Sequence, residues 1–249
     1  MSGYTTVTGI VCSVMTIGDY DKRLVLITKE RGRIAVFARG ARKTNSPMLA
    51  ASNPFVFGSF SIYEGRSSNQ LHSVEVREYF TELARMQPEV YYGFYFLEAA
   101  DYYTQEGLDA SDTINLLYIT LKALTTGKID AELIFVIYQL RLLQQQGECP
   151  QLFECVLSGE TQGLTHYSAV QHGVVVAAQL TQVPDARPIS VSALYAMQYI
   201  VTTPLAKLYS FQVTPEVLHE LQRLIHKEFA DKLDRKLKSL EILDVMRMP

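Results

Sequence analysis

Basic side chains are crowded into one short part of the chain. Of the 23 Lys and Arg residues, eight lie within residues 22–43, where the only acidic residue is Glu30. The rest of the chain keeps 15 of the basic residues and 25 of the 26 acidic ones, and the formal net charge of the whole is −3. A positive patch on an otherwise acidic protein attracts polyanions. The eight cations are Lys22, Arg23, Lys29, Arg31, Arg33, Arg39, Arg42 and Lys43.

The same stretch has the pattern of two strands joined by a tight turn at Gly32. Because side chains alternate across a strand, Arg33, Phe37 and Arg39 should share one face. Two guanidinium groups around an aromatic ring suit single-stranded nucleic acid, since Arg neutralises phosphate and the ring stacks on a base. Two alternatives stay open: the cations form a solvated face, and Phe37 packs inside the fold.

The sequence predicts strands in its first part and helices in its second part, and the strands carry these basic residues. Five strands are predicted in the first 80 residues, with a long polar connection between the third and the fourth, which is typical of a small OB-type barrel. An SH3-like barrel is the competing fold. From Pro88 the hydrophobic period becomes helical. Helices are predicted to begin near Pro88, Ser111, Asp130, Ser190 and Thr214, and the first three to end at Gly107, Gly127 and Gly147.

The predicted fold class is therefore α+β. A five-stranded OB-fold barrel over residues 1–80 precedes a mainly α-helical domain over residues 81–249, and the second domain contains a loop-rich insert with short strands at about residues 148–188. Three cysteines are an odd and small number, so reduced thiols in a cytoplasm are expected. The sequence shows no run of about 18 apolar residues and no secretory signal, so no membrane association is expected.

No catalytic spacing is visible in the sequence. It lacks a phosphate-binding glycine loop, a dinucleotide fingerprint, a nucleophile elbow and a zinc protease motif. Asp19 and Asp21 lie beside Lys22 and Arg23, so ion pairing is the simpler explanation for these two carboxylates. A metal-dependent nuclease would need a carboxylate cluster, and none is visible in the sequence. A protein that is not an enzyme is predicted.

Two further regions are candidates for contacts. The aromatic side chains of the helix predicted after Pro88 are expected to lie in the core. The alternative is that they form an apolar groove for a partner's peptide, whose carboxylates Arg141 or Lys122 would hold. The basic segment at residues 232–238 has a helical pattern. Its Lys236 and Lys238 either extend a nucleic-acid surface or form a solvated helix end.

Short motifs along nearly the whole chain resemble those of the bacterial recombination mediator family RecO. The most specific is Ala38-Arg39-Gly40-Ala41-Arg42-Lys43, placed after the predicted hairpin. The others are Asp21-Lys22, Glu30-Arg31-Gly32-Arg33, Tyr63-Glu64-Gly65-Arg66, Phe96-Leu97-Glu98, Leu140-Arg141-Leu142-Leu143 and Leu237-Lys238-Ser239-Leu240.

The resemblance implies a function that composition does not show. Members of that family bind single- and double-stranded DNA and anneal complementary strands in DNA repair. They contact the acidic, apolar C-terminal tail of single-strand-binding protein, and with RecR they help to load RecA. A cytoplasmic, nucleoid-associated protein is implied. The alternative from another functional class is an adaptor whose basic barrel binds acidic peptide tails.

The resemblance also implies a zinc module, and this chain departs from it. The family usually has two Cys-x-x-Cys pairs, of which Cys155 is the one matching thiol here. The other three positions hold Ser158, Val176 and Gln179. The residues of an alternative metal site would be Cys149, His166 and His172, but Cys149 lies six residues from Cys155, outside the usual ligand spacing. We therefore expect a degenerate module without zinc or another cofactor, in which the apolar residues 174–176 supply the packing.

Overall fold

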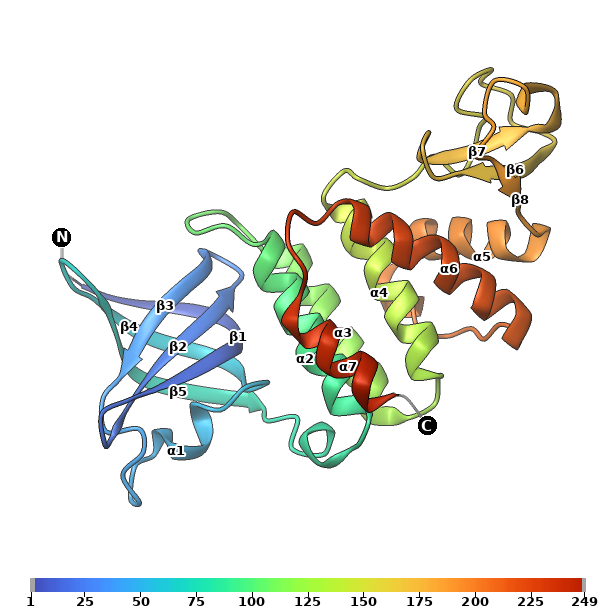
Figure 1. Cartoon of the computed structure of the whole chain (residues 1–249). Helices are drawn as coiled ribbons and strands as arrows, with labels where there is room; N and C mark the ends of the chain where they lie inside the picture. Colours follow the sequence, from blue (N-terminus) through green and yellow to red (C-terminus); the bar gives the residue numbers. More distant parts are fainter. Residues whose placement is uncertain (1–2, 248–249) are drawn as a thin grey trace. The chain divides into compact units, whose positions relative to one another are not determined.

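A computed structural model describes residues 3–247 (Figure 1). Backbone contacts divide them into two compact units. The first, here called the barrel unit, takes the described residues up to Thr125 and those from Leu237 onward. The second, the helical unit, takes residues 126–236. The predicted domain boundary at residue 80 stays a prediction.

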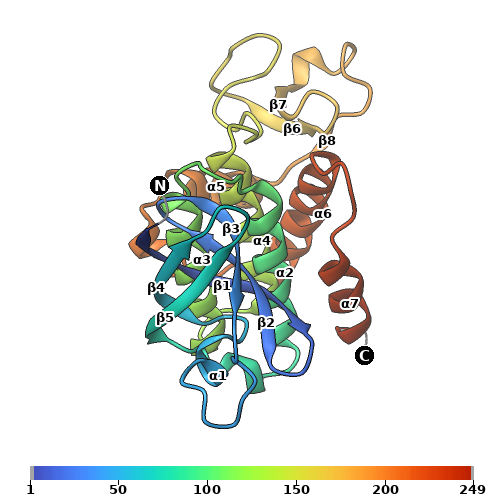
Figure 2. The same cartoon turned by 90° about the vertical axis from the view of Figure 1, so that its left-hand side faces the viewer.

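The barrel unit begins with a closed barrel whose strands follow the order β1-β2-β3-β5-β4. Neighbours in this order pair antiparallel, except that β3 and β5 run parallel where the barrel closes. A short helix, α1 (Met48–Ala51), stands at one end of the barrel in the connection from β3 to β4 (Figures 1 and 2). This architecture confirms the predicted OB-fold. The strands are β1 (Tyr4–Ile17), β2 (Asp21–Thr28), β3 (Gly32–Ala38), β4 (Phe57–Glu64) and β5 (Asn69–Glu78).

Alternation of apolar residues decides which side chains face the interior of the barrel. The inward positions form one buried cluster, and the outward positions of β3 are only half-buried. A bulge in β1 shifts the register between Val11 and Ser13, which leaves Cys12 pointing outward. The Cys12 Sγ donates to the Leu97 carbonyl at 3.3 Å, so α2 packs against this side of β1. The inward cluster includes Val7, Val11, Leu24, Leu26, Ile34, Val36, Phe60 and Ile62.

Helices of the barrel unit follow the strands. They are α2 (Glu89–Tyr103), α3 (Ser111–Thr126) and α7 (Lys238–Met246), with a single turn of 3-10 helix at Leu83–Arg85. The predicted starts of α2 and α3 are confirmed, and Gly107 and Gly127 adopt positive φ beyond their ends. The aromatic side chains Tyr92, Tyr95 and Phe96 of α2 are buried, so these three rings are core residues.

The predicted helical pattern at residues 232–238 is wrong. Helix α6 ends at Asp231, residues 233–237 form an irregular connection, and α7 begins only at Lys238. Helix α7 packs along α2. At its N-terminus, Glu98 of α2 accepts hydrogen bonds from the Lys238 and Ser239 backbone amides at 3.1 and 2.7 Å, and from the Ser239 hydroxyl at 2.5 Å. A carboxylate at this place satisfies amides that a helix start leaves unpaired.

Replacement of Glu98 by Ala is expected to loosen α7. The change removes an acceptor for three donors, and we expect it to lower the free energy of unfolding by about 1–3 kcal/mol. Limited proteolysis of the C-terminal segment and thermal unfolding measure the effect. Glu106→Ala, at an exposed position outside this contact, is the control. Equal resistance of both variants to protease would contradict the assigned role.

The helical unit contains α4 (Ala131–Gln145), α5 (Val191–Thr202) and α6 (Pro215–Asp231). The predicted starts are confirmed, because the side chains of Asp130, Ser190 and Thr214 accept hydrogen bonds from amides in the first turns. In the part of the chain that the structure describes, no helix is long and apolar enough to cross a membrane.

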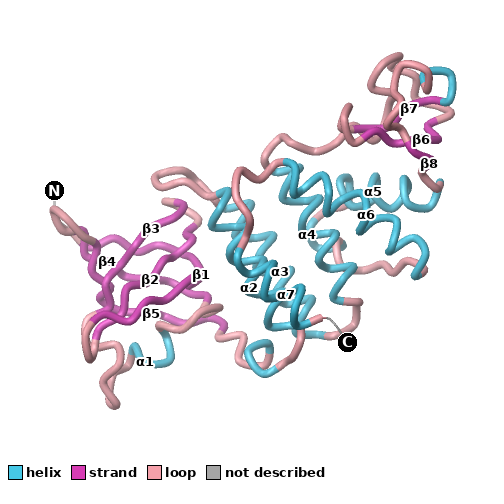
Figure 3. Tube along the Cα trace, viewed as in Figure 1, coloured by secondary structure: helices cyan, strands magenta, loops and turns pink. Residues whose placement is uncertain are grey.

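Between α4 and α5 lies the predicted insert, in which short strands stand among long loops (Figure 3). Its strands pair in the order β7-β6-β8. They are β6 (Leu164–Ser168), β7 (Gly173–Val176) and β8 (Arg187–Pro188), and the helical unit also has 3-10 turns at Ala177–Gln179 and Leu205–Lys207.

Candidate nucleic-acid interface

The eight cations of residues 22–43 do not form one patch. Strand β3 places Arg33 near its start and Arg39 just beyond its end, six residues and about 20 Å apart. The cations therefore fall into two groups at opposite ends of β3, and one cation, Lys22, is buried.

At the start of β3, the turn from β2 docks on the loop between α2 and α3. The Gly107 amide donates to the Arg31 carbonyl at 3.0 Å, and the Ala110 amide donates to the Lys29 carbonyl at 2.8 Å. The side chain of Arg31 pairs with Glu64, and the Arg33 Nε lies 2.5 Å from Asp101 Oδ1. Each guanidinium in this group thus already has a carboxylate partner.

Two neighbouring groups stabilise the charged form of Glu64 in the Arg31–Glu64 pair. A hydrogen bond from Thr5 and the nearby Arg31 guanidinium hold the pKa of Glu64 below its usual value. The side chains of Arg31 and Arg33 are 37% and 41% exposed, so they are not sealed from solvent, but the neighbouring carboxylates cancel much of their charge.

Lys22 was predicted to contact nucleic acid, and the structure gives it another position. The residue is 8% exposed. Its Nζ donates to Ser52 Oγ and Asn53 Oδ1 at 3.0 Å each, and to the Ser52 carbonyl at 3.3 Å. Burial, and then the charge of Arg42, lower the pKa of Lys22. Lys22 therefore holds the β3–β4 connection against the barrel.

Replacing Lys22 by Met should reduce stability rather than DNA affinity. Three acceptors lose their donor, and we expect a loss of about 1–3 kcal/mol in the free energy of unfolding, measured in urea. Lys43→Met, at an exposed position, is the matched control. It should leave stability within about 0.5 kcal/mol and weaken DNA binding instead. The opposite pattern would return Lys22 to the binding surface.

Beyond the end of β3, residues 39–43 form a short loop, here called the basic loop. The Gly40 amide donates to Asp21 Oδ1 at 2.7 Å, and the Arg42 amide donates to the Tyr20 carbonyl at 2.9 Å. Ala41 is fully buried in the barrel core. The loop backbone is thus fixed at three consecutive residues.

This anchoring directs the charged side chains outward. Arg39, Arg42 and Lys43 are all exposed. The Arg42 Nη1 reaches the Gly18 carbonyl at 3.2 Å, and the Lys43 Nζ lies 5.7 Å from the centre of the Tyr20 ring, which is itself 56% exposed. Because the backbone is already fixed, phosphate binding by these cations has to order only their side chains.

Phe37 lies on the outer side of the barrel beside the basic loop. Ile34, Val36 and Ala38 are buried while Phe37 is half-buried, so the alternative that Phe37 packs inside the barrel is wrong. Arg23 is its cross-strand neighbour on β2 and is also half-exposed. We call the combined surface the basic face; it consists of Tyr20, Arg23, Phe37, Arg39, Arg42 and Lys43.

The remaining predicted contacts are dispersed. The Arg141 Nη1 donates to the carbonyls of Ile200 and Val201 at 3.2 and 3.0 Å, which satisfies acceptors at the C-terminal end of α5. Burial lowers the pKa of Arg141. Lys236 and Lys238 are exposed on and beside the connection into α7. None of these three residues lies on the basic face as defined above.

Two models of protein families match the chain. The model described as "Recombination protein O N terminal" matches residues 1–80, and the model described as "Recombination protein O C terminal" matches residues 88–241. The chain belongs to the RecO family. The resemblance inferred from the short motifs is confirmed.

Relatives in the RecO family match nearly all or about two thirds of the chain. The DNA repair protein RecO of Alkaliphilus metalliredigens is 28% identical over 236 residues, which cover 94% of this chain and 96% of that protein. The DNA repair protein RecO of Bacillus pumilus is 28% identical over 241 residues, covering 96% and 93%. A relative from Exiguobacterium sp. with the same name is 32% identical over 171 residues, covering 69% and 68%.

Several of the RecO motifs contact one another or fix the backbone. Asp21 holds Gly40, Arg31 pairs with Glu64, and Glu98 holds the start of the Lys238-Ser239 helix. The motifs that identify the family are therefore partly structural. In the string at residues 38–43, Gly40 and Ala41 fix the loop while Arg39, Arg42 and Lys43 are presented to solvent.

The insert does not fit the zinc module of the RecO family. Of its four ligand positions, Cys155 and Val176 lie in one apolar cluster with Val175, Val183 and Ala186. Among the described residues, no group of three or more His, Cys, Asp or Glu side chains is arranged to hold a metal ion. A carbon side chain at one ligand position and one thiol in four do not provide a zinc site.

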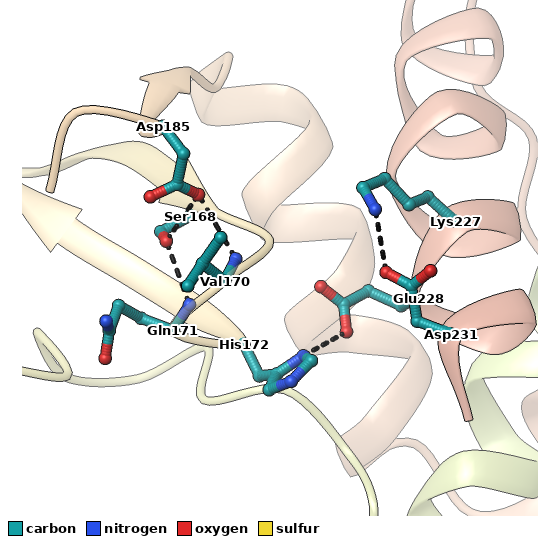
Figure 4. Close-up of polar contacts among 8 residues, drawn as sticks. All are labelled: Ser168, Val170, Gln171, His172, Asp185, Lys227, Glu228 and Asp231. Carbon is teal, nitrogen blue, oxygen red and sulfur yellow. Dashed lines mark hydrogen bonds and ion pairs between the residues drawn. The ribbon is translucent and has the colours of Figure 1, made fainter.

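Polar contacts hold the insert in the helical unit instead. The His172 Nδ1 lies 2.9 Å from Oε2 of Glu228, a residue of α6 that is 1% exposed (Figure 4). Within the insert, Asp185 accepts from the Ser168 hydroxyl at 2.8 Å and the Val170 amide at 3.1 Å. These contacts and the apolar cluster around Cys155 contribute to the stability of the insert.

Sequence reasoning missed an apolar groove between α5 and the start of α6. It encloses about 700 Å³. Val191 is 84% exposed and Tyr195 is 66% exposed on its wall. The signal that could have revealed it is the pair of apolar residues on the polar side of the predicted α5. The remaining apolar walls come from Ala196, Tyr199, Phe211, Val213 and Val217.

Proposed function

We propose that this RecO family chain binds single- and double-stranded DNA through the basic face and anneals complementary strands during DNA repair. One observation carries the proposal: Arg39, Arg42 and Lys43 are presented outward by a loop whose backbone is anchored at Gly40, Ala41 and Arg42. Phosphate contacts of this kind dominate affinity for nucleic acid and do not depend on sequence.

Annealing requires no catalytic group. Two strands repel each other as polyanions, and a bound cationic surface lets them approach. We therefore propose that the chain is not an enzyme and that no metal takes part. In the insert, the valine cluster around Cys155 takes over the stabilising role that zinc has in other members of the family.

An annealing assay tests this function. Two complementary labelled oligonucleotides are mixed without nucleotide or divalent metal, and the rate of duplex formation is followed. Wild type is expected to accelerate annealing at low salt and to lose the effect as salt rises. An Arg39→Glu/Arg42→Glu variant should not accelerate it. Equal rates with and without wild-type protein would overturn the proposal.

The family role extends to protein partners. We propose that the chain works with RecR to load RecA onto DNA covered by single-strand-binding protein, in the cytoplasm at the nucleoid. The groove beside α5 is the feature that best suits the acidic, apolar tail of single-strand-binding protein, because the apolar side chains of a peptide can be buried in an apolar groove. We propose that Lys207, in the 3-10 turn that follows α5, supplies a positive charge for the tail, since its charge acts on Tyr199 of the groove wall.

A labelled peptide with that tail's chemistry tests the groove. Tyr195→Asp should weaken peptide binding at least about tenfold, since exposed aromatic residues at interface centres carry much of the binding energy. Val170→Asp changes a similarly exposed apolar residue on the insert and should have no effect. If charge reversal on the basic face, rather than Tyr195→Asp, abolished peptide binding, the adaptor hypothesis would gain support.

A further inference from the structure

An outward row of side chains crosses the barrel at the level of Phe37. The strand registers place Arg23 opposite Phe37, Phe37 opposite Gln70, and Gln70 opposite Tyr63. The row continues to Tyr4 on β1 at one end and to Met15 on β1 at the other. With strands about 4.8 Å apart, the row runs about 24 Å over the barrel surface.

Exposed rings are concentrated at the β4 end of this row. Tyr4 is 66% exposed and Tyr63 is 37% exposed. Their ring centroids lie 5.4 Å apart, and the Tyr4 ring lies 5.0 Å from the imidazole of His72. Large rings at the surface of a barrel cost solvation energy without stabilising a core, so a cluster of them indicates a ligand that packs against rings.

Positive charges lie beside the row at two places. The basic loop lies beyond the end of β3, next to Phe37, and the exposed Arg66 lies in the turn that follows Tyr63. Glu64, the carboxylate nearest to Tyr63 in sequence, is paired with Arg31. A strand that follows the row would therefore meet cations near both the Phe37 ring and the Tyr63 ring.

We propose that single-stranded DNA follows this row and stacks its bases on Phe37 and then on the Tyr63–Tyr4 pair. The inference rests on the DNA-binding function proposed above and specifies the bound form. In a duplex the base faces are already stacked, so a duplex can use the cations but not the rings. The row thus selects unstacked single strands, and its length is compatible with OB-fold site sizes of about 4–16 nucleotides.

A Tyr4→Ala/Tyr63→Ala variant tests the row. Single-strand affinity should fall about 5- to 150-fold for each base that loses its stacking partner. The slope of log affinity against log salt should not change, because no phosphate contact is removed. Tyr79→Ala, which removes a ring that is 46% exposed just beyond β5, is the matched control. Circular dichroism at rising temperature shows that each variant is folded.

Two probes separate stacking from charge. An oligonucleotide with abasic sites throughout should bind wild type and the double variant equally, and so should a duplex. A 2-aminopurine base in the single strand should lose fluorescence on wild type and less on the variant. If the variant binds normal single strands as tightly as wild type while Arg39→Glu/Arg42→Glu does not bind, the row is wrong and the proposed function stands. If wild type binds no DNA, both are wrong.

Discussion

An Arg39→Glu/Arg42→Glu variant should bind single-stranded DNA about 100- to 1,000-fold more weakly than wild type at about 0.1 M salt. Both side chains are exposed on a loop whose backbone is fixed to the barrel, so their removal should not disturb the fold. Each substitution replaces attraction to phosphate with repulsion. Fluorescence anisotropy of a labelled oligonucleotide measures the change.

The control for this variant is Arg31→Gln/Glu64→Gln, which removes both members of an ion pair that includes a cation of the same basic stretch. The net charge stays the same, and no carboxylate is left without its partner. We expect DNA affinity to change less than about threefold, because the pair adds no net charge to the surface. A larger loss here than in the Arg39→Glu/Arg42→Glu variant would move the DNA to the other end of β3.

Gly32→Ala should be one of the most destabilising single changes in the barrel unit. Gly32 has φ of +59°, and a Cβ there would lie 2.0 Å from the Gln105 carbonyl oxygen and 2.8 Å from that of Leu108. Backbone atoms cannot move aside as a flexible side chain can. The β2–β3 turn would have to leave the α2–α3 loop, and we expect a loss of at least about 3 kcal/mol in the free energy of unfolding.

Gly18→Ala separates the clash from the strain of the backbone. Gly18 has a similar φ of +51°, but a Cβ there would have no atom within 4 Å. Its substitution should cost only about 1 kcal/mol. Urea unfolding of both variants provides the comparison. Equal losses would show that the docking of the turn contributes nothing beyond the glycine conformation.

Local patterns predicted most of the secondary structure because local interactions decide it. Alternation in β3 correctly placed Phe37 outside, and the side chains of Asp130, Ser190 and Thr214 cap the helices that they were predicted to start. Helix α7 was missed. Its start depends on Glu98, which is 141 residues away from Ser239, and sequence pattern does not report such a partner.

The candidate site was only half predictable for the same reason. Counting cations identifies the stretch of residues 22–43. Which of these cations are exposed and which are buried or paired depends on tertiary contacts. Lys22 turns toward Ser52, and Arg33 turns toward Asp101 of α2. The row from Phe37 to Tyr4 is a matter of strand register across a closed barrel, and the parallel pairing of β3 with β5 that completes it cannot be read from either strand alone.

The measurement that tests the central claim most directly is the salt dependence of single-strand binding, compared between wild type and Arg39→Glu/Arg42→Glu. Four cations of the basic face (Arg23, Arg39, Arg42 and Lys43) predict a slope of log affinity against log salt of about −3 for wild type. The variant should show a slope of about −1.5 or shallower. Unchanged affinity and slope in the variant would contradict a DNA site on the basic face, and absence of binding by wild type would contradict DNA binding altogether.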